Sequence, residues 1–587
     1  MEMSVRLILS TVTGLTLLLA PGLGLTDPSK AQRAEFNGAH ISGRYPSPVE
    51  AEHSMVVSSQ RDATRAGADI LAAGGNAVDA AVAIGYALAV THPCCGNIGG
   101  GGFATIHFAS GKETFINFRE KAPEAATPTM FQDAKGNVVA GLSLFSYKAV
   151  GVPGSVIGFE RMLKEYGTMS RVQVMAPAIK LADQGYVLQD GDVRIYAEGN
   201  KAFAKQPNVA SIFLNHGRPW KTGDRLVQKQ LAATLKEISS RGPDVFYKGD
   251  IARRVVDASK SNGGVLTMKD FADYTVTEGA PLNCDYRGYH IISSPPPSSG
   301  GTSMCEILNI LSGYPMGQYP VHSAKSIHLM VEAMRHTYVD RNFSLGDPDF
   351  VKNPVEELLS AKHAAAIRAQ IQGLKATPSD QVKIGVAPHE TNQTTHYSVV
   401  DKDGNAVAVT YTINGTFGAE MIAGDTGFLL NNEMDDFTSK VGTPNLDEIL
   451  QGDNNSIQPG KRPLSSMSPT IITKDGKLFM VTGSPGGSRI ITITLESILN
   501  VIDHHMDIQA AIDTPRVHHQ WMPDTIYIEQ NAVTSQVRKE LERDGYHFTD
   551  DPPWGSDEGI IIGARNGKRV LFGANDGRSP AGAAIGN

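Results

Sequence analysis

A short glycine-rich segment has the residue types needed to stabilise a developing negative charge. The sequence GSPGGS, residues 483–488, separates a strand-like stretch from a predicted helix over residues 489–502. The backbone N–H groups of Gly486 and Gly487 could point there toward one oxyanion, at the helix end where the dipole favours negative charge. A plain tight turn uses the same residues, so this segment alone supports either interpretation.

Acidic and hydroxyl side chains gather in two further segments. Three carboxylates follow an apolar stretch in LLNNEMDDF, residues 429–437, and PLSSMSP, residues 463–469, brings Ser465 next to Ser466. A run of carboxylates is usually a solvated loop. The functional alternative is a site for a ligand ammonium group, to which carboxylates make charge-assisted hydrogen bonds.

Two threonines are predicted to face each other across a hairpin. In THYSVVDKDGNAVAVTYT, residues 395–412, a three-residue loop with Gly404 in the left-handed conformation makes Asp401 face Asn405. Counting back along the strands then sets Thr394 opposite Thr412. Threonine is common on sheet surfaces, so the pairing by itself favours two structural residues.

The elements that must position these residues change in character at Gln393. Apolar periodicity predicts helices over residues 61–90, 155–260 and 323–372. Residues 103–120, FATIHFASGKETFINFRE, alternate about a turn and place Arg119 at the far end of the second strand of a hairpin. Short alternating strands dominate after Gln393. Helical blocks with antiparallel strands predict an α+β fold, in which two sheets lie between helix layers.

Composition indicates a globular protein that acts on small molecules. The 587 residues include 41% hydrophobic and 19% charged residues, enough to bury a large core. The length suggests several domains, but no repeat or linker marks a boundary, so one intertwined unit remains possible. The net charge of -8 argues against a nucleic-acid partner, because phosphate binding needs a basic surface.

The N-terminus is predicted to be a secretory signal. The stretch from Leu7 to Ala20 is apolar and uncharged, and PGLG follows it. It is shorter than the roughly 20 residues of a membrane span, so an uncleaved anchor is the weaker interpretation. The cut is expected between about Ala20 and Ala31.

Four cysteines are few for an exported protein of this size. Cys94 and Cys95 are adjacent, and neighbouring cysteines rarely meet the geometry of a disulfide. Cys284 and Cys305 could pair, although buried free thiols are at least as good an expectation. The Cys/His spacing does not predict a zinc site.

Longer strings of the sequence resemble the γ-glutamyltranspeptidase family. They are NQTTHYSVVDKDGNAVAVTYT, NNEMDDF, KRPLSSMSPTI, VTGSPGGSRII, HPCCGNIGGGGF and NFREKAP. The matches run in the expected order from about Arg61 to Gly577. The four-glycine run at residues 99–102 is thus part of a family signature, and the Lys-Ser/Thr pair of a phosphate loop does not follow it.

The resemblance implies a four-layer αββα N-terminal-nucleophile hydrolase sandwich, built from two autoprocessed subunits that form a heterodimer. The precursor would cut itself between Gln393 and Thr394, after the Thr394 hydroxyl attacks the Gln393 carbonyl. Residues 1–26 would be the signal peptide, 27–393 the large subunit and 394–587 the small subunit. The freed α-amino group of Thr394, with a reference pKa of about 7.7 to 8.0, suits a general base near neutral pH.

The same resemblance implies the roles of the remaining site residues. Thr412 would orient the nucleophile, and Gly486 with Gly487 would bind the oxyanion. A γ-glutamyl substrate would be held at its α-carboxylate by Arg119, Ser465 and Ser466, and at its α-ammonium by Asn414, Glu433 and Asp436. For Arg119, a surface ion pair with Glu120 or Glu124 is the alternative.

The implied activity is γ-glutamyl transfer from glutathione and other γ-glutamyl compounds to water, amino acids or peptides. Neither a metal nor a cofactor is implied, and the enzyme would be exported to the periplasm or outside the cell. A loop over about residues 438–454 resembles a lid of some bacterial members, with Asp447 where theirs carries Tyr. This difference leaves the balance of hydrolysis and transfer open.

Two other functions remain open. A glutaryl or cephalosporin acylase would use the same scaffold but would have less need of an ammonium site, so Glu433 with Asp436 argues against it. A non-enzymatic exported binding protein would keep the fold without maturing. The combination of Thr394, the two glycines and Arg119 argues against that second alternative.

Overall fold

The structure is a computed structural model that describes residues 45–371, 373–382 and 394–587. The predicted signal segment and Gln393 therefore lie outside the described residues. None of the described helices combines the length and hydropathy that a bilayer crossing requires.

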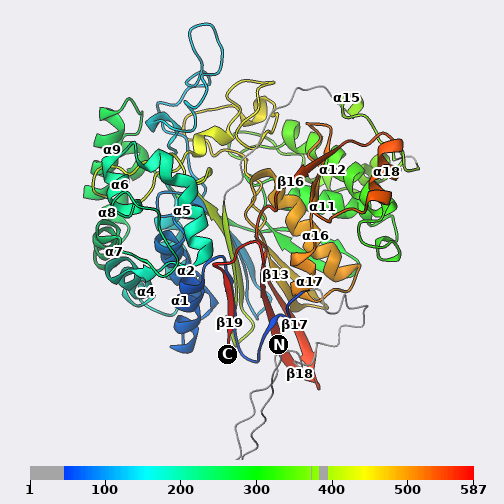
Figure 1. The fold of residues 1–587 in the computed structure, drawn as a ribbon, viewed down its shortest axis with the longest axis horizontal. Helices are drawn as coiled ribbons and strands as arrows, with labels where there is room; N and C mark the ends of the chain where they lie inside the picture. The colour runs from blue at the N-terminus through cyan, green and yellow to red at the C-terminus, as the bar shows by residue number, and fades with distance from the viewer. Residues whose placement is uncertain (1–44, 372, 383–393) are drawn as a thin grey trace, which may run out of the picture.

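Two seven-stranded antiparallel sheets lie face to face at the centre of the protein (Figure 1). The first has the order β1 (Val49–Ala51), β18 (Lys568–Asn575), β17 (Glu558–Arg565), β13 (Lys477–Thr482), β12 (Thr470–Lys474), β9 (Tyr289–Ser293), β8 (Leu282–Tyr286). The second has the order β19 (Ala583–Gly586), β2 (Met55–Ser58), β10 (Thr395–Val400), β11 (Ala406–Thr412), β3 (Gly101–His107), β4 (Glu113–Asn117), β7 (Thr277–Gly279). Buried apolar side chains of both sheets, among them Val57 and Leu571, pack in the layer between them. Each sheet combines strands from before and after residue 393.

Helices cover the two outer faces, which confirms the predicted αββα arrangement. The helices beside the second sheet, at the left of Figure 1, are α1 (Arg61–Ala72), α2 (Ala77–Thr91), α3 (Ser155–Tyr166), α4 (Arg171–Gln184), α5 (Asp190–Phe203), α6 (Pro207–Phe213), α7 (Lys229–Arg241), α8 (Asp244–Tyr247), α9 (Asp250–Ser261) and α10 (Met268–Ala272). Those beside the first sheet are α11 (Gly300–Leu311), α12 (Ala324–Ser344), α13 (Val355–Leu358), α14 (Ala361–Arg368), α15 (Ser379–Val382), α16 (Ile490–Ile502), α17 (Ile508–Asp513) and α18 (Ser535–Arg543). Two small sheets, β5 (Tyr186–Val187) with β6 (Arg225–Leu226), and β14 (Val517–His518) with β15 (Ile526–Glu529) and β16 (Phe548–Asp551), complete the fold.

Helix α2 packs directly against the strands that carry the predicted threonines. All of its residues are buried, as its predominantly apolar sequence predicts. Its start is a capping box, in which the Asn76 side chain accepts from the N–H of Asp79, and the Asp79 carboxylate accepts from the N–H of Asn76. Asp79 also accepts from the Thr168 N–H at 2.9 Å, which joins α2 to the segment before α4.

The hairpin of β10 and β11 has the predicted register. Thr395 pairs with Tyr411, and the Asp401 N–H donates to the Asn405 carbonyl at 3.0 Å. Gly404 has φ of +92°, the left-handed conformation that the three-residue loop requires. Thr394 therefore lies opposite Thr412, one residue beyond the last strand pair.

Asp401 fixes this hairpin to the N-terminus of α2. Its carboxylate accepts from the N–H of Asp403 at 3.0 Å and of Asn405 at 2.9 Å, within the turn. The same carboxylate accepts from the N–H of Ala77 at 3.0 Å. Ala77 is the first residue of α2, where unpaired N–H groups and the helix dipole favour a negative charge.

The four-glycine run at residues 99–102 serves close packing of backbones. A Cβ atom at Gly100 would lie 1.9 Å from the Thr412 carbonyl oxygen, and one at Gly99 would lie 2.2 Å from that of Leu429. Side chains are therefore excluded where β3 approaches β11 and the segment after it.

Both pairs of cysteines form disulfides. Cys284 joins Cys305, with Cα atoms 6.0 Å apart, which settles one open alternative. Cys94 joins Cys95, so the expectation that these neighbours stay apart is wrong. The two residues lie in a turn, where the Cys94 carbonyl accepts from the Phe417 N–H and the Cys95 carbonyl from the Ile413 N–H.

Replacing Asp401 tests the link between the hairpin and α2. In Asp401→Ala, buried N–H donors lose a charged acceptor, and we expect the free energy of unfolding in urea to fall by about 2 to 4 kcal/mol. Asp403→Ala is the matched control, because Asp403 is exposed in the same turn; it should change this free energy by less than about 0.5 kcal/mol. Equal losses in the two variants would contradict the role of Asp401.

Candidate active site

The two threonine hydroxyls meet as predicted. Thr394 and Thr412 are buried, and the Thr394 Oγ1–H donates to Thr412 Oγ1 at 3.4 Å. Thr412 Oγ1 also accepts from the Asn414 N–H at 2.8 Å, which sets the orientation of its side chain. The Thr394 hydroxyl is thus hydrogen-bonded to the Thr412 hydroxyl, which the Asn414 N–H holds in position.

The glycine turn lies beside Thr394, between β13 and α16. Gly486 has φ of +140° and Gly487 has φ of +53°, both in the region that favours glycine. A Cβ atom on Gly486 would lie 2.8 Å from Ile493 Cδ1. Gly487 starts the short 3₁₀ turn that leads into α16, so the N-terminal end of this helix lies at a cavity that also has Thr394 in its wall.

A small cavity of about 20 Å³ brings together all the described site residues that the sequence predicted, except Gly486. Its walls include Arg119, Thr394, Thr412, Asn414, Glu433, Asp436, Ser465, Ser466 and Gly487. Asp447, Met467 and Ile490 complete the lining. Met467 and Ile490 were missed, since an apolar residue next to a motif has no pattern that separates it from ordinary core.

Arg119 forms the centre of a buried charge cluster. It is 1% exposed, and its Nη1 and Nη2 donate to Glu433 and Asp436, with Glu120 at 3.7 Å. The carboxylate run after β11 is buried, so the solvated-loop alternative is wrong, and so is a surface ion pair for Arg119. Glu124, the other suggested partner, does not pair with it.

Burial and charge oppose each other in this cluster. Burial raises the pKa of Glu433 well above its usual value, against the effect of Arg119. Burial likewise raises the pKa of Glu120 to about 7. Burial acts to lower the pKa of Arg119, but the neighbouring carboxylates outweigh it and raise that pKa. One cation faces three carboxylates, so a further positive charge, such as a ligand ammonium group, would be attracted to the cavity.

The two serines present hydroxyl donors to the same cavity. Ser465 Oγ accepts from the Met467 N–H at 3.1 Å, and the Ser465 N–H donates to the Pro297 carbonyl at 2.9 Å. Within the described ranges, neither the Ser465 nor the Ser466 hydroxyl donates to a protein acceptor. Both hydrogens therefore remain for a ligand, and a carboxylate accepts such bonds well.

The segment that resembles a lid contributes Asp447 to the wall of the cavity. The Gln520 side chain donates to the Asp447 carbonyl at 3.3 Å, and the Tyr527 hydroxyl donates to Glu448 at 2.9 Å. On the other side, Asp435 accepts from the Leu446 N–H at 2.7 Å, and burial raises its pKa to about 6. These bonds fix the loop to the segment that contains Gln520 and Tyr527, and to Asp435 beside the charge cluster.

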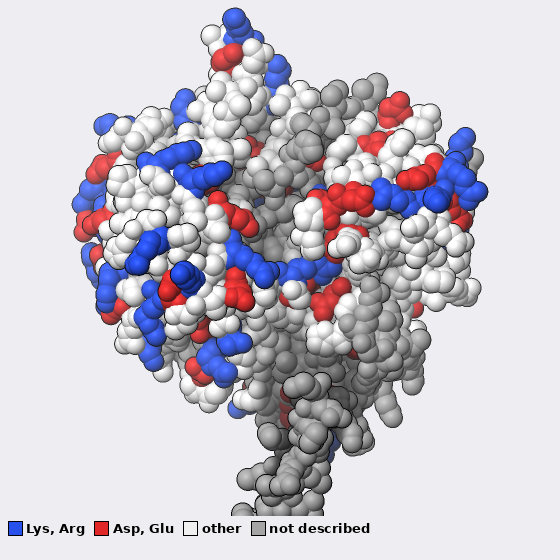
Figure 2. Space-filling model, in the orientation of Figure 1, with Lys and Arg blue, Asp and Glu red and all other residues white. Residues whose placement is uncertain are grey.

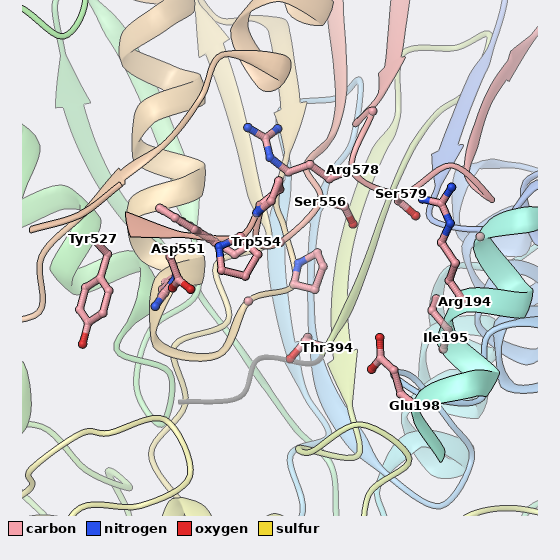
Figure 3. Close-up of a pocket in the computed structure, with 18 of the residues that line it drawn as sticks. Arg194, Ile195, Glu198, Thr394, Tyr527, Asp551, Trp554, Ser556, Arg578 and Ser579 are labelled. Atoms are coloured by element: carbon pink, nitrogen blue, oxygen red, sulfur yellow. The ribbon is translucent and has the colours of Figure 1, made fainter. Parts of the chain in front are cut away.

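A second, open cavity of about 1380 Å³ has Thr394 and Gly486 in its wall. Figure 3 shows Thr394 between Arg194 and Glu198 of α5 on one side and Asp551 and Trp554 on the other. The surface is hollowed between α5 and β16 in Figure 2. Charged side chains of both signs line this cavity, among them Arg194, Glu198 and Asp551, and no sequence motif predicted these charged residues.

Two groups of possible metal ligands occur among the described residues. His92 adjoins Cys94 and Cys95, whose sulfurs are bonded to each other. Glu306 and Asp340 both contact His363 Nε2, at 3.2 and 3.0 Å. The smaller cavity contains none of these side chains.

The chain is similar to several known proteins. Residues 63–586 match the family model described as gamma-glutamyltranspeptidase. The chain is 55% identical to the glutathione hydrolase proenzyme of Pseudomonas sp. (strain A14), over 92% of this chain and 95% of that one. It is 49% identical to the glutathione hydrolase proenzyme of Escherichia coli (strain K12), over 91% of each. The crystal structure of cephalosporin acylase from Bacillus halodurans superposes with a TM-score of 0.80 at 27% identity, over 93% of this chain and 98% of that one.

Replacing Arg119 tests the charge cluster through stability. In Arg119→Gln the buried Glu433 and Asp436 lose their cation, and we expect a loss of about 3 kcal/mol at pH 8. A carboxyl group whose pKa is higher in the folded than in the unfolded protein binds more protons when folded, so stability falls as pH rises from about 4.5 through the raised pKa. The loss should therefore be smaller at pH 5.5 than at pH 8, as measured by urea unfolding.

A second substitution serves as the control. Adding Glu433→Gln to Arg119→Gln removes one of the two uncompensated carboxylates, so it should restore part of the stability at pH 8. An equal loss at both pH values, without such recovery, would show that charge is not what Arg119 balances.

Proposed function

The chain belongs to the γ-glutamyltranspeptidase family, and on that premise we propose that it is a γ-glutamyltransferase and glutathione hydrolase with Thr394 as its nucleophile. The observation that carries the proposal is the pair of threonine hydroxyls, at 3.4 Å, in the wall of a cavity that also contains Arg119 and Glu433. A γ-glutamyl donor ends in an α-carboxylate and an α-ammonium group, and this cavity offers partners for both.

Maturation would begin on the intact chain. The Thr394 hydroxyl attacks the Gln393 carbonyl, the peptide nitrogen leaves as the ester forms, and water then hydrolyses the ester. The products are a Gln393 carboxylate and a free α-amino group on Thr394. Residues 27–393 would be the large subunit and 394–587 the small subunit of a heterodimer, and residues up to about 26 a signal for export to the periplasm or the medium.

Turnover would use the freed amino group as the general base. It takes the proton of the Thr394 hydroxyl as the oxygen attacks the γ-carbonyl, and Thr412 orients the reacting groups. The N–H groups of Gly486 and Gly487 would stabilise the oxyanion. The leaving amine receives the proton, and water, an amino acid or a peptide then attacks the acyl-enzyme ester.

Donor recognition would exchange one set of ion pairs for another. The α-carboxylate would bind Arg119, Ser465 and Ser466, and the α-ammonium would bind Asn414, Glu433 and Asp436. Arg119 contacts Glu433 and Asp436 directly in this structure, and the cavity is only about 20 Å³. A donor must therefore separate these groups, and its two opposite charges give each of them a new partner.

The larger cavity would take the other half of the substrate. Thr394 is the residue that both cavities share in their walls, so an acyl group in the small cavity directs its leaving amine into the large one. The same space would admit the acceptor, because transfer reverses the departure of the amine. Its mixed charges suit zwitterionic amino acids and peptides.

Self-cleavage tests the nucleophile. The purified protein should give two fragments on a denaturing gel, and N-terminal sequencing of the smaller one should begin TTHYSVV. Thr394→Ala lacks the attacking hydroxyl, so it should remain one inactive chain. Cleavage of Thr394→Ala at the same bond would refute the assignment.

Donor choice tests the ammonium site and separates this function from that of a glutaryl acylase. In Asp436→Asn the shape is kept, but a γ-glutamyl donor loses a charge-assisted bond that a glutaryl donor never had. We expect the ratio of kcat/KM for γ-glutamyl and glutaryl 4-nitroanilides to fall about ten- to a hundredfold, or 1.5 to 3 kcal/mol. Both enzymes are first checked for maturation on a gel.

The neighbouring carboxylate provides the control for this experiment. Asp435 bonds Ser143 and Leu446 and does not line the cavity. Asp435→Asn should therefore leave the donor ratio of the wild type in place. If Asp436→Asn lowers kcat/KM for both donors by the same factor, Asp436 supports the structure and does not recognise the ammonium group.

A further inference from the structure

A buried arginine, Arg341 of α12, lies directly behind the serines of the small cavity. It is 2% exposed. Its Nη2 donates to Ser466 Oγ at 2.9 Å, and its Nε donates to Ser299 Oγ at 2.9 Å. The Ser299 hydroxyl in turn donates to the Ser465 carbonyl at 2.6 Å. Arg341 thus holds both serines, one directly and one through Ser299.

Among the described residues, Arg341 differs from the other buried arginines because no carboxylate forms an ion pair with it. Its third contact, from Nη1 to Asn342 Oδ1 at 2.8 Å, is again with a neutral group. The remaining buried arginines of the described residues each pair with a carboxylate; they are Arg119, Arg335, Arg462, Arg489 and Arg516. An uncompensated cation is costly to bury, so its counterion is expected from outside the protein.

The surroundings of Arg341 indicate where that counterion lies. Burial lowers the pKa of Arg341, and the carboxylates that oppose this effect are Asp436 and Asp447. Both belong to the wall of the small cavity. The positive charge of Arg341 therefore acts on this cavity from behind Ser466.

The hydrogen bond to Ser466 also has a direction. A guanidinium group can only donate, so Ser466 Oγ is the acceptor of the bond from Arg341. The hydroxyl hydrogen of Ser466 is left to donate elsewhere, and the side chain lines the cavity. Arg341 thereby makes Ser466 a donor toward a ligand, and polarises that donor.

We propose that Arg341 is a positioning residue for the α-carboxylate of the donor, whose negative charge it balances through Ser466. The proposal rests on the function proposed above, and it adds a second cation to the carboxylate site. Arg119 is already paired with two carboxylates, whereas Arg341 contributes a positive charge that forms no ion pair with a described carboxylate. The enzyme should accordingly select donors that carry an α-carboxylate more strongly than Arg119 and the hydroxyls alone would allow.

Three donors with one leaving group test this proposal. The γ-glutamyl 4-nitroanilide carries both charges, the glutaryl compound carries only the carboxylate, and the 4-aminobutyryl compound carries only the ammonium. In Arg341→Gln the ratio of kcat/KM between γ-glutamyl and 4-aminobutyryl donors should fall about tenfold, mainly through KM. The kcat/KM for the glutaryl donor should fall together with that for the γ-glutamyl donor, because both donors have the carboxylate.

Arg341→Lys and Arg368→Gln are the companion variants. Lysine keeps the charge without the fork of donors, so Arg341→Lys should recover part of the selectivity. Arg368 of α14 also donates only to neutral groups, the carbonyls of Asn309 and Ile310, but it is outside the cavity wall. Arg368→Gln should keep the donor ratios of the wild type.

A purely structural role gives a different result. If Arg341→Gln and Arg341→Lys each lower kcat/KM for all three donors by the same factor, the proposal is wrong. Should Arg341→Gln fail to mature, the same comparison is made with Arg341→Lys. Ser466→Ala should then lower the ratio of kcat/KM between γ-glutamyl and 4-aminobutyryl donors less in the Arg341→Lys background than in the wild type. Equal costs in the two backgrounds would overturn the proposal.

The wild type alone tests the proposed function separately. A wild-type enzyme that does not prefer the γ-glutamyl to the 4-aminobutyryl donor would have no carboxylate site, and the proposal for Arg341 would fall with it. A wild-type preference that survives in both Arg341 variants would contradict only the proposal for Arg341.

Discussion

Side chains on neighbouring strands alternate between two faces, so a slip of the β10–β11 pairing by one residue would turn Thr412 away from Thr394. The whole site depends on this register. Gly404 shapes the turn, Asp401 ties it to α2, and the glycine run of β3 lets the neighbouring backbone approach. The geometry of two hydroxyls at one end of the hairpin is thus set by a glycine and a carboxylate at the other end.

Charge is distributed unevenly around the small cavity. Three carboxylates surround Arg119, while no carboxylate of the described residues forms an ion pair with Arg341. The first cluster therefore attracts a positive charge and Arg341 attracts a negative one, and both are removed from water. A molecule with an ammonium and a carboxylate on one carbon neutralises the two together, which a singly charged ligand cannot do.

Local rules predicted the parts of the site that are close in sequence. The register of Thr394 and Thr412 follows from counting residues about Gly404, and α2 follows from its cap and its apolar run. The contact between Arg119 and Glu433 could not be derived in this way, because the two residues are 314 positions apart. The family resemblance placed them in one site, but it assigned them to different ends of a substrate and not to each other.

Other features depended on tertiary surroundings that no short pattern carries. The carboxylates of residues 433–436 resemble a solvated loop in sequence but are buried, and Glu433 and Asp436 contact Arg119 there. Arg341 sits in α12, a helix whose residues are mostly buried, and its role appears only from its contact with Ser466. The bond between Cys94 and Cys95 required the turn after α2. The burial of the carboxylates and the role of Arg341 depend on partners distant in the chain, whereas the disulfide depends on the local path of the backbone.

Strands from before and after residue 393 lie side by side in both sheets, with β10 and β11 between β2 and β3, and the run of β12, β13, β17 and β18 between β9 and β1. Each sheet needs strands from both halves, so a continuous chain keeps the two sets of strands together while the sheets form. Before the cut, refolding is a first-order process that does not depend on protein concentration. After it, two separate chains must find each other, and refolding becomes second-order. Cleavage would thus turn a protein that can recover from unfolding into one whose lifetime is set by its rate of unfolding.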